Sequence, residues 1–146
     1  MALEIKTSYI SFSTSGDTDI IDITRHVSDR IAEAGLEEGQ VLLCVPGSTA
    51  AITTIEYECG AISDLKEAIE NLAPIGKYYR HNERWDDGNG HAHVRAALMG
   101  PSLTVPVING RLALGTWQQI VFIDFDNRPR ERRVLVQLTG KKKQSG

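Results

Sequence analysis

The sequence predicts a single α+β domain, mainly antiparallel β-sheet, with two longer helices and one short helix. The 146 residues are enough for one domain with a buried core, and 41% of them are hydrophobic. The expected order is strand, helix, two strands, helix, loop and then four closing β segments. This order is typical of an α+β fold built on antiparallel sheet.

The first strand and the first helix are expected before residue 36. Residues 3–12 carry apolar side chains in an imperfect alternation, which indicates a strand. Asp22 is suited to cap a helix that Gly35 can end. The apolar stripe of this helix consists of Ile23, Val27, Ile31 and Ala34.

Two strands and a second helix follow. The continuous apolar run at residues 41–45 predicts a strand buried on both faces, and the β-branched residues at 51–57 predict a second strand. The turn at residues 46–50 joins them. A helix is expected over residues 64–72, with Ser63 as its cap, because its apolar residues share one face.

The remaining β segments close the domain after a short helix that is expected to begin near His93. Asn109-Gly110 supplies the two positive-φ residues of a tight hairpin, and Pro106 marks an edge or a bulge. The hairpin strands are expected at 103–108 and 111–114, and the last two strands at 118–125 and 132–138, joined by a turn at 126–129.

Composition excludes several classes of protein. The net charge of −3 provides no general attraction to nucleic acid or anionic lipid. Two cysteines are too few for a disulfide scaffold, the first residues lack the pattern of a signal peptide, and no apolar run reaches 18 residues. We therefore expect a cytoplasmic protein without nucleic-acid or membrane partners, whose domain spans 1–140 and is followed by a basic flexible tail at 141–146.

Three of the four histidines, His81, His91 and His93, fall within 13 residues. Three imidazoles with an open position suit a catalytic divalent metal. His91 and His93 point the same way only if 90–93 is extended, which the glycines before them favour. The alternative is a polar surface loop at 79–88 whose histidines bind nothing. Its acids Glu83, Asp86 and Asp87 either orient the imidazoles or are simply solvated.

Further candidates lie outside the histidine window. Ser48 and Thr49 follow a glycine in a turn that could aim donors at a phosphate, or is simply a hairpin turn. Glu56 is an acid in an otherwise apolar strand, costly to bury without a partner unless it faces outward. Trp117 and Gln118 are suited to stacking on a planar ring or to packing the core.

The run Ser102–Ile120 resembles the signature of the YjbQ family, also called the secondary thiamine-phosphate synthase family. The resemblance extends over nearly the whole chain, so that 1–140 is similar to a YjbQ-like domain. Further matching segments are Asp22-Ile23-Thr24, Ala50-Ala51 with Glu56, Tyr79-Arg80-His81, Gly90-His91-Ala92-His93 and Arg132–Val136. The chain departs from many members at Gly47-Ser48, where they carry histidine and threonine.

The resemblance implies a homotrimer with metal-binding histidines in clefts near the subunit interfaces, and weak thiamine-phosphate synthase activity. That reaction joins hydroxymethylpyrimidine pyrophosphate to a thiazole phosphate and releases pyrophosphate. In an enzyme of this kind, His81, His91 and His93 would hold a divalent metal, Zn or Mg, and Glu56 would be an acid/base or orienting group. The small-molecule phosphate substrate would contact Ser48, Thr49 and Arg111, with Trp117 and Gln118 shaping the pocket.

Two other functions use the same residues. One is a non-enzymatic, metal-stabilised trimer that binds a small molecule. The other is a metal-dependent phosphohydrolase in which the metal activates water.

Overall fold

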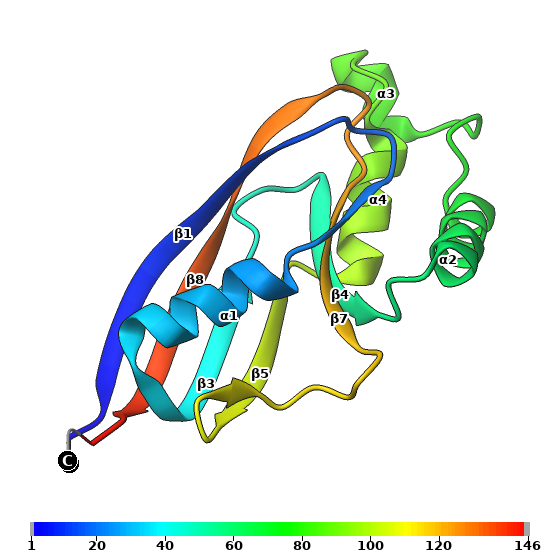
Figure 1. The fold of residues 1–146 in the computed structure, drawn as a ribbon. Coiled ribbons are helices and arrows are strands. Elements are labelled where there is room, and N and C mark those ends of the chain that lie inside the picture. Colours follow the sequence, from blue (N-terminus) through cyan, green and yellow to red (C-terminus); the bar gives the residue numbers. More distant parts are fainter. Residues whose placement is uncertain (1, 145–146) are drawn as a thin grey trace.

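The computed structural model describes residues 2–144, which form eight strands and four helices (Figure 1). The strands are β1 (Glu4–Thr14), β2 (Asp19–Asp22), β3 (Leu36–Cys44), β4 (Ala50–Ile55), β5 (Ser102–Ile108), β6 (Arg111–Leu112), β7 (Gln119–Asp124) and β8 (Arg130–Lys142). The helices are α1 (Thr24–Ala34), α2 (Cys59–Leu72), α3 (Arg80–Trp85) and α4 (Gly90–Met99).

The strands form two antiparallel sheets, as an α+β fold of this kind requires. The larger sheet has the order β1-β8-β3-β5-β6, and the smaller has the order β2-β7-β4. Helix α1 crosses in front of the larger sheet in Figure 1, whereas α2 and α4 lie beside the smaller sheet. The predicted fold class is confirmed.

The core has two parts that meet across β7. Ile120 and Phe122 pack with α1 and the inner face of the larger sheet, where the rings of Phe12 and Phe122 meet edge to face at 4.9 Å. Val121 and Ile123 alternate with them and pack against α2 and α4. The strand buried on both faces is therefore β7. The strand predicted at residues 41–45 is present at the end of β3, but its predicted burial on both faces was wrong, because one side of β3 stays partly exposed.

Several local predictions are confirmed. Asp22 lies one residue before the N-cap residue, Ile23, and its carboxylate accepts hydrogen bonds from the backbone and side chain of Thr24 at the start of α1. Gly35 ends that helix in the left-handed conformation, at φ 65°. Asn109 and Gly110 have φ values of 53° and 75° and turn β5 into β6.

Other boundaries differ from the predictions. The turn at 46–49 is no hairpin turn, because β3 and β4 belong to different sheets. Helix α2 begins five residues before Asp64, since the Glu58 carboxylate caps it by accepting from the Gly60 and Ala61 amides, which holds the pKa of Glu58 below its usual value. Helix α3 and strand β2 were not predicted.

The first two residues of the expected tail, Lys141 and Lys142, belong to strand β8. Strand β8 continues to Lys142, which is opposite Leu36 of β3. The last two residues of the expected tail, 145–146, lie outside the described residues. Within residues 2–144, no helix is both long enough and apolar enough to cross a membrane.

Candidate metal centre

The candidate site lies where α3 and α4 meet. The loop between them turns through Asp86 and Gly88, at φ 50° and 69°. The first residue of α4, Gly90, lies so close to Tyr79 that a Cβ there would be 2.5 Å from the tyrosine Cβ. This close approach brings His81 of α3 next to His93 of α4, with ring centroids 4.4 Å apart.

The segment 90–93 is helical rather than extended, which overturns one prediction. The glycines that favoured an extended chain serve other purposes, since Gly88 makes the turn and Gly90 allows close packing. On a helix, residues i and i+2 point about 200° apart. His91 and His93 therefore face different ways, and only His93 joins His81.

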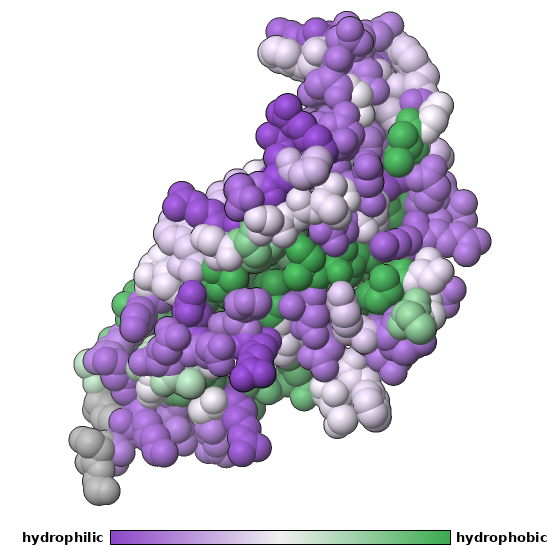
Figure 2. All heavy atoms as spheres, turned by 45° about the horizontal axis from the view of Figure 1, so that its top comes forward, coloured by the Kyte–Doolittle hydropathy of each residue, from purple (hydrophilic) through white to green (hydrophobic). Residues whose placement is uncertain are grey.

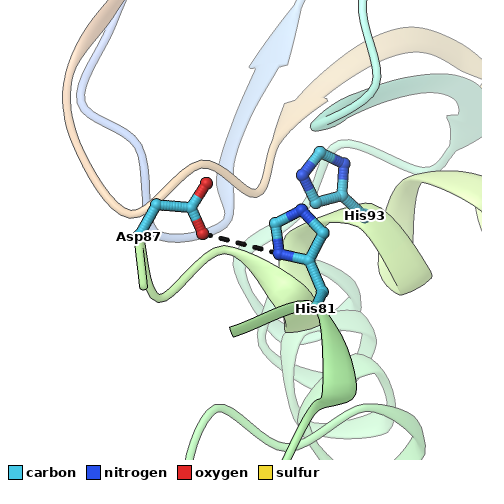
Figure 3. A group of neighbouring side chains, drawn as sticks. All are labelled: His81, Asp87 and His93. Carbon is cyan, nitrogen blue, oxygen red and sulfur yellow. Dashed lines mark ion pairs between the residues drawn. The ribbon is translucent and has the colours of Figure 1, made fainter. Parts of the chain in front are cut away.

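Both δ nitrogens of the two clustered histidines face an acceptor in the protein. The Nδ1 atom of His81 lies 3.5 Å from a carboxylate oxygen of Asp87. The Nδ1 atom of His93 lies 3.1 Å from the backbone oxygen of Ser48. Figure 3 shows the two rings side by side, with Asp87 on one side of His81 and His93 on the other.

His81, Asp87 and His93 together offer a divalent metal two imidazoles and one carboxylate. One ligand atom from each of His81, Asp87 and His93 lies within 4.8 Å of the other two. Metal-binding histidines almost always donate the second ring N–H to a carboxylate or a backbone carbonyl, and the Ser48 carbonyl is placed to accept from His93 in this way. Asp87 lies beside Nδ1 of His81 at ion-pair distance without a hydrogen bond to it. Imidazole nitrogens favour Zn²⁺ over Mg²⁺, which prefers oxygen ligands.

The third predicted ligand, His91, lies apart from this group. Its side chain is only 2% exposed, and its ring lies 6.5 Å from that of Tyr79. Burial, reinforced by the nearby Arg95 guanidinium, lowers the pKa of His91, so the neutral form is favoured. Its Nε2 atom meets no hydrogen-bond partner within residues 2–144. The structure therefore groups His81, Asp87 and His93, and leaves His91 in the interior.

A cavity of about 210 Å³ lies directly beside His93. Most of the residues around it are small, which leaves room for a compact ligand next to the imidazole. The lining residues are Gly47, Ser48, Ala50, His93, Ala96, Ala97 and Pro101.

The residues predicted in the turn at 46–49 divide between this cavity and the interior. Ser48 is exposed and lines the cavity. Thr49 is 7% exposed, and its hydroxyl accepts from Arg132 and donates to Asp126. The Thr49 hydroxyl is therefore occupied inside the protein, whereas Ser48 lies beside His93.

The remaining predicted residues gather at the opposite end of β4. Glu56 follows the last residue of that strand and is exposed, so the reasoning from a buried acid does not apply to it. Trp117 is 73% exposed, and Gln118 donates to Thr54 at 3.1 Å. Arg111 and Gln118 line a separate cavity of about 330 Å³. Six residues of extended strand, roughly 20 Å, separate this group from the histidines.

Sequence reasoning missed a buried charged network beneath the turn at 46–49. Asp124 and Asp126 have exposures of 0% and 1%, and Arg132 pairs with both at 2.7 and 3.8 Å. Burial alone raises the pKa of Asp126, but hydrogen bonds from Arg130, Asn89 and Thr49 outweigh it and hold that pKa below its usual value. The sequence does carry a signal for this network. Two acids, Asp124 and Asp126, stand at the end of the apolar strand β7, and arginines follow at every second residue, 128, 130 and 132.

Sequence comparison supports the resemblance seen in the sequence. A family model described as UPF0047 protein YjbQ-like matches residues 8–141. A UPF0047 protein of Archaeoglobus fulgidus is 44% identical over 127 residues, 87% of this chain and 96% of the relative. A UPF0047 protein of Methanothermobacter thermautotrophicus is 40% identical over 139 residues, 95% of each chain.

Solved structures agree with this relationship. A YbjQ-like protein of unknown function from Sulfolobus solfataricus matches with a TM-score of 0.91 and 31% identity, over 96% of this chain and 100% of that one. A YjbQ/UPF0047 protein from Clostridium acetobutylicum matches with a TM-score of 0.82 and 37% identity, over 90% of this chain and 98% of that one. This chain therefore belongs to the YjbQ-like UPF0047 family.

Proposed function

We propose that this chain is a metal-dependent cytoplasmic enzyme with weak thiamine-phosphate synthase activity, and that it works as a homotrimer. The observation that carries the metal part is the cluster of His81, Asp87 and His93, in which one ligand atom from each residue lies within 4.8 Å of the other two. The Ser48 carbonyl beside Nδ1 of His93 adds the outer partner that metal-binding histidines usually have. The synthase activity follows from the family resemblance. The metal we expect is zinc, held by the two Nε2 atoms, with Asp87 orienting His81.

The surroundings of the histidine pair suit a phosphorylated ring compound. In the synthase reaction the C–O bond to pyrophosphate breaks with both electrons leaving on oxygen, and the thiazole nitrogen bonds to the freed methylene carbon. A bound divalent cation supplies positive charge against the departing pyrophosphate. The cavity beside His93 would hold the ring, because Ala96 and Ala97 leave its wall without bulky side chains.

A trimer would bring the two separated groups of predicted residues together. Within one chain, Glu56, Arg111, Trp117 and Gln118 lie roughly 20 Å along β4 from the histidines, too far to share a small ligand with them. Figure 2 shows apolar side chains gathered in a band across one face, between hydrophilic regions. Such a band is typical of a surface that another chain covers. We therefore propose that a neighbouring subunit contributes Arg111, Trp117 and Gln118.

Product formation by purified protein tests the activity. The protein, loaded with zinc, is incubated with hydroxymethylpyrimidine pyrophosphate and thiazole phosphate, and thiamine phosphate is measured chromatographically. We expect slow formation that chelator, His81→Ala and His93→Ala each abolish. His26→Ala is the matched control, because His26 is exposed on α1, which contributes no residue to the cluster. Activity that survives both histidine substitutions would refute the proposal.

The same assay separates the two alternative functions. Release of inorganic phosphate from either substrate without thiamine phosphate would indicate a phosphohydrolase, which is favoured by the exposure of Asp87 and the partial exposure of both histidines, since water could reach a metal there. A trimer that dissociates in chelator, with no turnover of any kind, would indicate a non-enzymatic metal-stabilised assembly.

Subunit complementation tests the shared site. Arg111→Ala and His93→Ala subunits, each inactive alone, are unfolded, mixed and refolded together. If the site is shared between subunits, some interfaces in the mixed trimers carry both intact residues, and activity returns. If each chain carries its own complete site, the mixture stays as inactive as its components.

A further inference from the structure

The turn at 46–49 is held in place by the buried side chains of Asp124 and Asp126, which Arg132 connects to Thr49. The Arg132 guanidinium donates from Nε and Nη2 to the two oxygens of Asp124, at 2.7 and 2.9 Å. Its Nη2 atom also donates to the Thr49 hydroxyl at 2.7 Å, and that hydroxyl donates to Asp126 at 3.1 Å. Thr49 is thus held from both sides by a buried ionic network.

The same turn determines which nitrogen of His93 carries the proton. The backbone oxygen of Ser48, one residue before Thr49, lies 3.1 Å from Nδ1 of His93. A carbonyl oxygen only accepts, so Nδ1 must be the protonated nitrogen in neutral His93. Nε2 is then unprotonated and free to act as a ligand.

The network also holds the start of α4, which carries His93. The Asn89 amide group donates to Asp126 at 3.4 Å, and the Asn89 side-chain oxygen accepts from the Asn127 backbone at 3.0 Å. Asp126 therefore contacts both Thr49 and the residue that precedes α4. The Ser48 carbonyl and the His93 ring are positioned from one common base.

We infer that Arg132 and Thr49 are positioning residues that set the Nδ1–H tautomer of His93 through the Ser48 carbonyl, and so present Nε2 to the metal. The metal part of this inference rests on the proposed function, whereas the tautomer does not. Arg132 acts without touching the metal or the substrate. Its role depends on the planar fork of the guanidinium, which spans Asp124 and Thr49 at once, and a lysine cannot reproduce it.

The test reads the tautomer directly in metal-free protein. Long-range ¹H–¹⁵N correlation spectra at about pH 8.5, where histidine is neutral, distinguish protonated from unprotonated ring nitrogens. We expect Nδ1–H for His93 in the wild type and in Thr49→Ser, which keeps the hydroxyl. In Thr49→Val and Arg132→Lys we expect a shift of the population towards Nε2–H. His81, which faces Asp87 instead, is the internal control and should not change.

Zinc affinity provides the second reading. We expect Thr49→Val to lose about 10- to 100-fold in affinity, the usual effect of removing an outer partner of a metal ligand, and Thr49→Ser to recover it. An unchanged His93 tautomer in both Thr49→Val and Arg132→Lys would overturn the inference, as would Nε2–H in the wild type. If Thr49→Val does not fold, Arg132→Lys decides. Wild type that shows the expected tautomer but binds no zinc would refute the proposed function and leave the positioning role standing.

Discussion

The contact between Gly90 and Tyr79 provides a sharp test of how the site is built. A Cβ at residue 90 would lie 2.5 Å from Cβ and 2.8 Å from Cγ of Tyr79, and 3.0 Å from the Asn82 side-chain oxygen. Ordinary contacts between such atoms begin near 3.4 Å, so Gly90→Ala must push α4 away from Tyr79 or displace the ring. Overpacking of this kind costs about 1–3 kcal/mol. For a chain of this size, that loss lowers Tm by roughly 2–12 °C.

The assay is unfolding in urea, monitored by circular dichroism, with Gly76→Ala as the matched control. A Cβ at residue 76 would meet no atom within 4 Å, and Gly76 has no positive φ, so its replacement should leave stability unchanged or raise it by about 0.4–1 kcal/mol. Gly90→Ala should also weaken zinc binding, because α4 carries His93. Equal unfolding midpoints for the two variants would refute the view that close packing at Gly90 brings the histidines together.

Three further outcomes are expected. Because the pKa of Asp126 is lower in the folded than in the unfolded state, its contribution to stability is complete above about pH 5 and is lost as the pH falls. The free energy of unfolding of Asp126→Asn, measured as the pH is lowered, should therefore decrease less steeply than that of the wild type. Arg95→Ala should lower the free energy of unfolding in urea by about 2–4 kcal/mol, because Arg95 is 3% exposed and donates to Glu70, Thr18 and the Ala73 carbonyl. The control Arg25→Ala, at an exposed position, should change it by no more than about 0.5 kcal/mol. Light scattering should give the mass of three chains, and a monomer mass at micromolar concentration would contradict the proposed assembly.

Local signals predicted much of the fold because they act over a few residues. The Asn109-Gly110 turn and the Gly35 helix end require positive φ, and the structure has it at both places. The antiparallel pairing followed from the order of the segments. What local signals cannot provide is the partner of a strand. The run at 41–45 and the strand β7 are both apolar, and only the tertiary arrangement decides that β7 is covered on both faces.

The grouping of the histidines was predicted in part, for a similar reason. The histidine window contains all three residues of the cluster, and two of them, His81 and His93, were among the predicted ligands. Whether Gly90 gives an extended segment or a close helix contact depends on Tyr79, which no pattern around Gly90 reveals. Asp87 appeared only as one of several loop acids, because its place beside His81 arises from the turn at Gly88.

Zinc titration of metal-free protein by calorimetry tests the central claim most directly, with His91→Gln and His93→Gln compared under the same conditions. The two substitutions are chemically identical and two residues apart on one helix, but only His93 faces His81. We predict that wild type binds one zinc ion per chain, that His93→Gln loses this binding, and that folded His91→Gln retains it. A wild type that takes up no zinc, or a His93→Gln variant that binds zinc as tightly as wild type, would contradict the proposed metal centre.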